Sequence, residues 1–348
     1  MTAMSNERPQ GCAVSSSATA RPVRVLGTGV ARPGRQVTSR ELDVRLGLPS
    51  GTVQRRSGVR VRHVETERSA AALGAEAARH ALAAAGVDLG DVDCVVAASA
   101  SMDQAMPCNA ALIHRELGLG ESGVPAFDIG ASCLGFLTAV DTLSWPIAAG
   151  RYRRVLLVAA DIASCALDWT RLEASAIFGD GAAAAVLGPA AGSASCLLAS
   201  AFSTYSEGAH FCEIRAGGSR HHPSRSNGDY VGLAQFRMDG PAVFRLVAQH
   251  IDAFVGTLLR TAGVERREID LLVPHQASHL GMRHVTRRLG ICRDRVIDIY
   301  ADHGNQVAAS LPSALDAAIA SGRLKRGDTA LLLGSGAGVS LGGVVMRY

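Results

Sequence analysis

One short pattern occurs twice in this 348-residue chain, once in each half. Residues 85–101 read AGVDLGDVDCVVAASAS and residues 262–278 read AGVERREIDLLVPHQAS, and 7 of these 17 positions are identical without gaps. A second match follows each copy in the same order, at 148–161 and 320–336. Any two helix–turn–strand units look alike to a degree, but two matches that keep order and spacing favour duplication. We therefore expect two similar halves, with the seam near residues 190–195.

The pattern between these repeats predicts an α/β fold. Short, continuously apolar runs are typical of strands buried on both faces, and helical patterns separate them. Such alternation indicates helices packed in layers on sheets. The halves would span 21–190 and 195–348, after a disordered polar tail at 1–20. The expected strands are 23–30, 94–98, 125–129, 155–160, 182–187, 196–202, 271–273, 296–299, 330–333 and 343–346, and the expected helices include 70–85, 109–117 and 241–262.

Composition excludes several classes of protein and partner. Hydrophobic residues make up 48% and charged residues 19%, which is typical of a globular chain. The net charge of +4, without a basic run interleaved with aromatics, argues against a nucleic-acid partner. No apolar run reaches the roughly 20 residues of a membrane span, so we expect no membrane partner. The eight cysteines form no C-x-x-C pair, so we expect no metal site, and free thiols indicate the cytoplasm.

The segment FDIGASCLGF at 127–136 contains a candidate nucleophile. A buried strand leads into small residues and then Cys133, and an apolar helical stretch follows. At a helix N-terminus, the dipole and free backbone N–H groups favour thiolate over thiol. Most cysteines are small buried hydrophobes, which is our interpretation of the other seven, but the surroundings of Cys133 are those of a nucleophile.

Two further segments contain candidate polar partners. His275 in LLVPHQAS directly follows a buried strand, at the strand end where α/β folds place their sites. Asn305 follows His303 and Gly304 in a turn that precedes an Ala-rich helix. Taken alone, Asn305 is best interpreted as the N-cap of that helix. Together with Cys133 and His275, it becomes a candidate member of a reactive triad.

Two glycine-rich segments, FGDGAAAAVLG at 178–188 and LLLGSGAGVSLGG at 331–343, lack the features of a nucleotide-binding loop. Neither ends in Lys-Ser/Thr, and neither is a G-x-G-x-x-G followed by an acidic residue. We interpret both as tight turns between strands, with backbone amides close to a ligand.

Taken together, these motifs resemble the 3-oxoacyl-ACP synthase III (β-ketoacyl synthase III) family of condensing enzymes. The resemblance covers about residues 21–348 and rests on five segments in order: those around Cys133, His275 and 303–305, and the two glycine-rich runs. It implies the thiolase fold, in which two duplicated halves form a five-layer αβαβα sandwich. It also implies a homodimer that takes acyl-CoA or acyl carrier protein thioesters as substrates and needs no cofactor.

The resemblance further implies a two-step reaction. Cys133 would accept an acyl group from a thioester, with the backbone N–H groups of Cys133 and Ala337 as the oxyanion hole. A malonyl thioester would then lose carbon dioxide, and His275 and Asn305 would stabilise its enolate. A decarboxylative Claisen condensation would give the 3-oxoacyl thioester. Such enzymes serve fatty acid, polyketide and other secondary-metabolite biosynthesis.

The substrate-binding positions follow from the same resemblance. Arg56 matches a residue that contacts coenzyme A phosphate, and Gly240 and Phe244 match residues of the phosphopantetheine channel. Ser278 replaces the Asn that ends the P-H-Q-A-N motif in the family. Met106 matches a residue that reaches across the dimer into the acyl pocket of the partner.

Several positions differ from the housekeeping form of the family. Thr52 replaces a Trp that stacks on adenine, Leu172 replaces a second coenzyme A-binding Arg, and Ala337 replaces a Gly. These differences predict a specialised member, from a secondary-metabolite or unusual lipid pathway. An acyltransferase that passes the Cys133-bound acyl group to a hydroxyl or amine is the alternative, although such relatives often carry an acid where this chain has Asn305. A degradative thiolase fits less well because residues 334–338 contain no second Cys.

Overall fold

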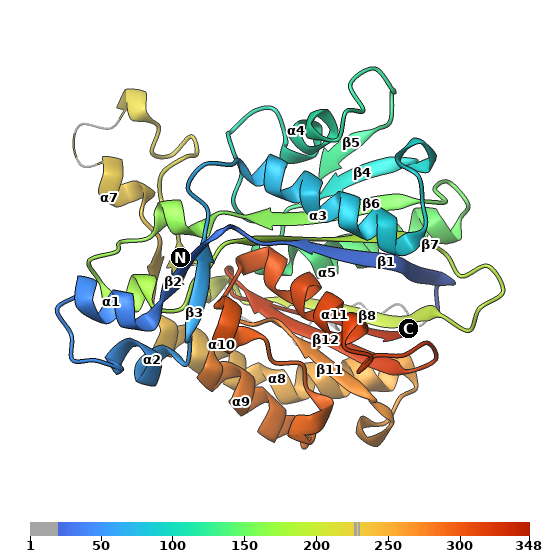
Figure 1. Cartoon of the computed structure of the whole chain (residues 1–348). Helices are drawn as coiled ribbons and strands as arrows, with labels where there is room; N and C mark the ends of the chain where they lie inside the picture. The colour runs from blue at the N-terminus through green and yellow to red at the C-terminus, as the bar shows by residue number, and fades with distance from the viewer. Residues whose placement is uncertain (1–19, 226–227, 229) are drawn as a thin grey trace, which may run out of the picture.

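Two large β-sheets and three layers of helices form the body of the computed structural model, which describes residues 20–225, 228 and 230–348 and includes two further two-stranded sheets. Helices lie between the sheets and on the outer face of each, so the order of layers is αβαβα (Figure 1). The expected five-layer sandwich is therefore confirmed. The tail predicted at 1–20 lies, apart from Ala20, outside the described residues.

The first sheet comes from the N-terminal part of the chain. Its strands are β1 (Val23–Ala31), β4 (Cys94–Ala97), β5 (Ala126–Asp128), β6 (Val155–Asp161) and β7 (Gly181–Pro189). They are ordered β1-β7-β6-β4-β5. β4 is parallel to β5 and β6, whereas β7 is antiparallel to β6 and β1. Every residue of β4 and β6 is buried, as expected for strands covered by helices on both faces.

The second sheet repeats this arrangement. Its strands are β8 (Cys196–Thr204), β11 (Leu271–Pro274), β12 (Thr329–Gly336) and β13 (Ser340–Arg347), in the order β11-β12-β13-β8. The first pair is parallel and the next two are antiparallel, as in β4-β6-β7-β1. Each strand of this sheet thus has a counterpart in the first, which confirms the duplication.

Helices fill the remaining three layers. α3 (Ala70–Ala85) and α4 (Asn109–Glu116) cover the outer face of the first sheet, and α8 (Gly240–Ala262) and α9 (His279–Leu289) cover that of the second (Figure 1). α5 (Gly135–Ala148) and α11 (Ser310–Ala320) lie between the sheets and share one hydrophobic core with both. Small residues allow close packing: a Cβ on Gly29 of β1 would lie 2.3 Å from the backbone N of Ala81 in α3.

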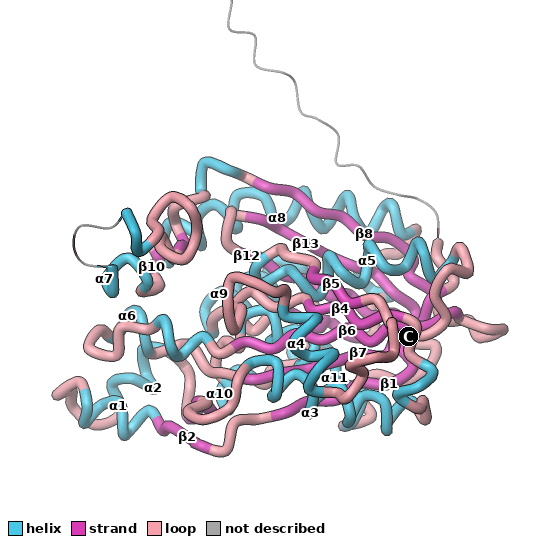
Figure 2. The backbone as a smooth tube through the Cα atoms, turned by 90° about the horizontal axis from the view of Figure 1, so that it is seen from above, coloured by secondary structure: helices cyan, strands magenta, loops and turns pink. Residues whose placement is uncertain are grey.

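Shorter elements surround the sandwich. α7 (Tyr230–Ala234) and β10 (Arg237–Met238) lie at the end of the molecule opposite the C-terminus (Figures 1 and 2). The remaining strands and helices are β2 (Arg35–Thr38), α1 (Ser39–Arg45), α2 (Thr52–Ser57), β3 (Val61–Val64), α6 (Leu172–Ser175), β9 (Cys212–Glu213), α7 (Tyr230–Ala234), β10 (Arg237–Met238) and α10 (Tyr300–His303). The 3₁₀ helices that matter for the site are η2 (Ser132–Leu134) and η8 (Val307–Ala309).

Two predictions of local structure are wrong. Residues 296–299 form no strand: Val296 makes only an isolated bridge to Leu272, because the chain turns at Asp298 into α10. Residues 178–188 are not a turn, since most of them belong to β7. The glycines there permit close approach instead, because a Cβ on Gly181 would lie 2.1 Å from the side-chain nitrogen of Gln306.

Helix α8 has the length and composition of a membrane span, although core helices of soluble proteins pass the same test. It was not recognised as such in the sequence. In the structure, Phe254, Val255, Leu258 and Leu259 of this helix are buried in a cluster with residues of β8, β12 and β13.

Candidate active site

Cys133 lies where the chain leaves β5 and enters α5, as predicted. Ser132 has a φ of +50°, which turns the backbone sharply before the cysteine. Gly135 begins α5, and a Cβ at this position would lie 2.4 Å from the carbonyl oxygen of Ala98. The glycine therefore allows the start of α5 to pack directly against the end of β4.

The hairpin between β12 and β13 supplies the other wall of this turn. Gly336 lies so close that a Cβ there would be 3.6 Å from the backbone N of Cys133. The backbone N–H of Ala337, at the tip of the hairpin, acts to lower the pKa of the Cys133 thiol, as does the N–H of Cys133 itself. The prediction that 331–343 forms a turn between strands is confirmed, and its amides approach the thiol.

His275 follows β11 and is 4% exposed. Its backbone N–H donates to the Leu333 carbonyl at 2.8 Å, which fixes it beside β12. Gly334 of β12 lies between the histidine and Leu134, because a Cβ there would be 3.0 Å from both side chains. The side chain of Gln276 fixes this segment, because its amide oxygen accepts from the Ile299 N–H and its amide nitrogen donates to the Pro274 carbonyl. His275 and the Cys133 turn thus both lie next to Gly334 of β12.

Asn305 lies in an irregular turn between α10 and η8. Gly304 has a φ of +68°, and its position leaves no room for a Cβ, which would lie 2.7 Å from the Ile177 carbonyl oxygen. The Asn305 N–H donates to that same carbonyl at 2.7 Å, so the turn is docked against the FGDG segment. The side-chain Oδ1 accepts from the Val307 N–H at 2.9 Å, and Nδ2 lies 3.4 Å from the Ala277 carbonyl oxygen.

The N-cap interpretation of Asn305 is therefore wrong for α11, which is preceded by Ala309. The side-chain oxygen of Asn305 accepts a hydrogen bond from the Val307 N–H within the same turn. The side-chain nitrogen is therefore the group that can donate to another molecule. Nδ2 contacts the segment that begins with His275, and His275 and the Cys133 turn are both next to Gly334, so the three residues belong to one region of the structure.

Burial controls the ionisation of the site. It raises the pKa of the Cys133 thiol to about 12, with a further rise from the charge of Asp161, although the Ala337 N–H works in the opposite direction. The expectation that the helix start favours the thiolate is thus outweighed by desolvation. Burial also lowers the pKa of His275 to about 4, so its imidazole is neutral at neutral pH. The Nδ1 of His275 is buried and has no partner among the described residues.

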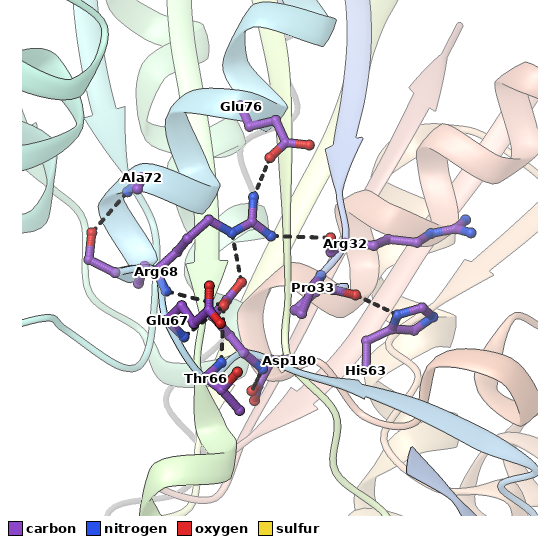
Figure 3. Close-up of polar contacts among 12 residues, drawn as sticks. Arg32, Pro33, His63, Thr66, Glu67, Arg68, Ala72, Glu76 and Asp180 are labelled. Atoms are coloured by element: carbon purple, nitrogen blue, oxygen red, sulfur yellow. Dashed lines mark hydrogen bonds and ion pairs between the residues drawn. The ribbon is translucent and has the colours of Figure 1, made fainter. Parts of the chain in front are cut away.

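Two buried aspartates near the site were missed in the sequence. Asp161, at the end of β6, accepts hydrogen bonds from the loop after β4 and from η8. Asp180 accepts from Ser164 and from the backbone N–H of Glu65, and it lies beside the 65–68 turn in which Arg68 pairs with Glu65 at 2.9 Å (Figure 3). An Asp at the end of an apolar strand, such as Asp161 in β6, is a sequence pattern that indicates a buried carboxylate, and such a group requires several hydrogen-bond donors.

The predicted substrate-binding residues are more dispersed. Arg56 is exposed on α2. The end of this helix packs on α9, because a Cβ on Gly58 would lie 2.8 Å from the Cβ of His279. Ser278 caps α9, its hydroxyl accepting from the Gly281 N–H at 3.1 Å.

Two of the other three positions lie on α8, and the third lies in a loop of the first half. Gly240 begins α8, and Phe244 of that helix makes an edge contact with His284 of α9, with ring centroids 4.8 Å apart. Met106 is 82% exposed in the loop before α4 and has no described contact with the other four.

Comparison with known proteins identifies the family. Profiles described as 3-oxoacyl-[acyl-carrier-protein (ACP)] synthase III and its C-terminal part match residues 127–206 and 259–348. The β-ketoacyl-[acyl-carrier-protein] synthase III of Neisseria meningitidis serogroup C is 33% identical over 331 residues, which is 93% of this chain and 99% of the relative. This chain belongs to the 3-oxoacyl-ACP synthase III family of condensing enzymes. The expected family is confirmed.

Solved structures agree with this assignment. The 3-oxoacyl-ACP synthase III of Pseudomonas aeruginosa is 31% identical, with a TM-score of 0.84 over 94% of this chain and 98% of the other. The enzyme of Aquifex aeolicus is 28% identical, with a TM-score of 0.84 over 95% and 100%. The priming β-ketosynthase of the R1128 polyketide pathway is 29% identical, with a TM-score of 0.85 over 94% and 96%. The expected thiolase fold is thus confirmed, and this chain is an enzyme.

Proposed function

We propose that this chain loads an acyl group onto Cys133 and extends it by decarboxylative condensation with a malonyl thioester, as a 3-oxoacyl-ACP synthase III-type acyltransferase. The observation that carries the proposal is the convergence on one thiol. The N–H groups of Cys133 and Ala337 both act on the Cys133 thiol. The buried His275 and Leu134 of the Cys133 turn both lie next to Gly334, and the Asn305 amide contacts the carbonyl of Ala277, two residues after His275. Backbone N–H donors beside the nucleophilic sulfur suit the oxyanion that develops on the thioester carbonyl oxygen during acyl transfer.

In the first step, the Cys133 sulfur attacks the thioester carbonyl. A carbon–sulfur bond to Cys133 forms, the bond to the donor thiol breaks, and that thiol leaves with the proton. With a pKa of about 12, the thiol must lose its proton as it reacts, and the neutral His275 is a base within the site. The N–H groups of Cys133 and Ala337 stabilise the oxyanion.

In the second step, a malonyl thioester loses carbon dioxide, and its electrons form an enolate. Hydrogen bonds from neutral His275 and from the Asn305 amide stabilise the enolate oxygen. The enolate carbon attacks the acyl-Cys133 carbonyl, a carbon–carbon bond forms, and the Cys133 sulfur leaves and takes a proton from solvent. The product is a 3-oxoacyl thioester. This chemistry calls on no metal or organic cofactor besides the thioesters.

The partners follow from the same proposal. Coenzyme A or an acyl carrier protein would present the thioester along the rim formed by Arg56, Gly240, Phe244 and Ser278. The exposed Met106 suits a homodimer contact, in which it would complete the partner's acyl pocket. The seven described cysteines are free, which suits the cytoplasm.

The test is intact-mass spectrometry of wild type, Cys133→Ala and Cys165→Ala after incubation with acyl-CoA and acyl-carrier thioesters. Cys165→Ala is the control because it removes a different free thiol, one that is exposed. We expect an acyl adduct on wild type and Cys165→Ala only, and its release as a 3-oxo product when malonyl thioester is added. An adduct that malonyl thioester never discharges would favour the hydroxyl or amine acyltransferase, and no adduct at all would refute the proposal.

A further inference from the structure

Asp161 is a fully buried carboxylate that ties three parts of the chain together. Its Oδ1 accepts from the backbone N–H groups of Ala100 and Ser101, at 2.9 and 2.7 Å, and from the Ser101 hydroxyl at 2.9 Å. Its Oδ2 accepts from the Ala309 N–H at 3.2 Å. The side chain is 0% exposed, so these donors are its whole polar environment among the described residues. A carboxylate at such a site stays charged only because the donors are held in place.

The contact with Ala309 supports the turn that carries Asn305. Between them lies Val307, whose φ is +55°. A β-branched residue in the left-handed region is strained and persists only where the surroundings hold it. Inside the turn, the Val307 N–H donates to Asn305 Oδ1, and the Ala309 N–H also approaches the Gln306 carbonyl at 3.1 Å. Asp161 adds a hydrogen bond that holds η8 from outside the turn.

The same carboxylate lies close to the nucleophile. η8 packs on both β6 and η2, and η2 contains Cys133. The charge of Asp161 acts on the Cys133 thiol and raises its pKa. Asp161 therefore binds η8, which follows the turn of Asn305, and lies close enough to Cys133 for its charge to act on the thiol.

We infer that Asp161 is a positioning residue for the second half-reaction: by holding the Ala309 N–H, it aims the Asn305 amide at the enolate of the malonyl thioester. The inference rests on the proposed function and extends it. Acyl transfer to Cys133 depends on the Cys133 and Ala337 N–H groups, which Asp161 does not contact. Condensation depends on the Asn305 amide, which it steadies through η8.

Asp161→Asn separates these roles. The asparagine has one acceptor oxygen and one donor nitrogen, and three donors face the Oδ1 position whereas one faces Oδ2. The amide oxygen will therefore face Ala100 and Ser101, and the amide nitrogen will face the Ala309 N–H, donor against donor. The loop after β4 stays bound, and η8 is pushed away.

The experiment measures both half-reactions with the full-length protein: acylation of Cys133 by stopped intact-mass spectrometry, and carbon dioxide release from malonyl thioester on the acylated enzyme. For Asp161→Asn we expect condensation to fall by about 10- to 100-fold, the effect of misplacing a group by about 1 Å, with acylation nearly unchanged. Alkylation of Cys133 by iodoacetamide should become faster, because a nearby negative charge is gone. A residue with a merely structural role would slow both half-reactions together and would not speed alkylation.

Two further variants make each outcome decisive. Ser101→Ala removes a donor from the other side of Asp161 and should leave the ratio of the two half-reactions unchanged. Ala309→Pro removes the donated N–H itself at a residue whose φ of −71° proline can adopt, and should reproduce the selective loss. Equal loss in both half-reactions, unaltered condensation, or failure of Asp161→Asn and Ala309→Pro alike to fold would overturn the inference. A wild type that forms no adduct or product would instead refute the proposed function.

Discussion

The buried ion pair between Arg21 and Asp141 gives a sharp test of how the two halves are held together. Arg21 precedes β1 and exchanges backbone hydrogen bonds with Leu197 of β8, at 2.9 and 3.0 Å. Its guanidinium donates to Asp141 of α5 at 2.6 Å and to Ser200 of β8 at 2.9 Å. Its side chain is 1% exposed, and that of Asp141 is 25% exposed. Three elements from both halves therefore meet at one charge.

Asp141→Ala leaves this guanidinium buried without its carboxylate. Removing one partner of a buried pair costs about 3–5 kcal/mol. Ser200 remains as an acceptor, and water can reach the space left by the partly exposed aspartate, so we expect a smaller loss, about 2–4 kcal/mol. For a chain of this size, such a loss lowers Tm by about 3–6 °C.

The assay is thermal and urea unfolding of wild type, Asp141→Ala and the double variant Arg21→Met/Asp141→Leu, all at one protein concentration. The double variant removes the charge and its partner together, so it should recover most of the lost stability. A change below about 0.5 kcal/mol for Asp141→Ala would refute the reasoning, because that is the range of an ordinary surface substitution. A double variant as unstable as Asp141→Ala would also refute it, since the stranded charge would then not be the cause.

Three further predictions concern the site. Gly304→Ala places a Cβ 2.7 Å from the Ile177 carbonyl oxygen at a φ of +68°, so it should cost about 1–3 kcal/mol in urea unfolding and reduce condensation more than acylation of the enzyme; unchanged stability would contradict this. Iodoacetamide at pH 8 should label the exposed Cys292 before Cys133. Because the pKa of Cys133 is about 12, its labelling rate should rise about tenfold per pH unit up to pH 10. A labelling rate for Cys133 that stops rising below pH 8 would contradict this high pKa. Burial lowers the pKa of His275 to about 4, so its contribution to stability is present above pH 6.5 and is lost as the pH falls towards 4. His275→Gln should reduce this fall in the free energy of unfolding between pH 6.5 and 4 by roughly 3 kcal/mol. If the free energy of unfolding of the variant fell with pH as steeply as that of wild type, the neutral imidazole would be contradicted.

The regular parts of the fold were accessible from sequence because their determinants are local. α3 was predicted with its observed bounds, since Ser69 caps one end and Gly86 ends the other in the left-handed region. Buried runs such as those of β4 and β6 were recognised because both faces are apolar. The failure at 296–299 has a local cause as well: the run is apolar, but Tyr300 begins a helix before a ladder can form.

The site was harder to predict because its properties arise from contacts distant in sequence. The small residues around Cys133 gave its place at a helix start, but the burial that raises its pKa comes from the β12–β13 hairpin and the layers on either side. Asp161 was missed because its partner Ala309 lies 148 positions away. Asn305 was correctly singled out, but its amide is oriented by Val307 and Ala277 rather than by a helix that it caps.

The duplication itself explains how distant motifs reach one site. α5 and α11 occupy the same layer, and each is preceded by a 3₁₀ helix whose first residue has positive φ, Ser132 at +50° and Val307 at +55°. Cys133 lies in the first of these 3₁₀ helices, and Asn305 lies two residues before the second. The same local backbone conformation, present once in each half, therefore places both residues next to the central layer of helices. His275 aligns with Ala98 in the repeat, and both follow the corresponding strand ends of β11 and β4. A chain that folds as two similar halves, packed through their central helices, thus brings its strand-end residues together without any one motif specifying the others.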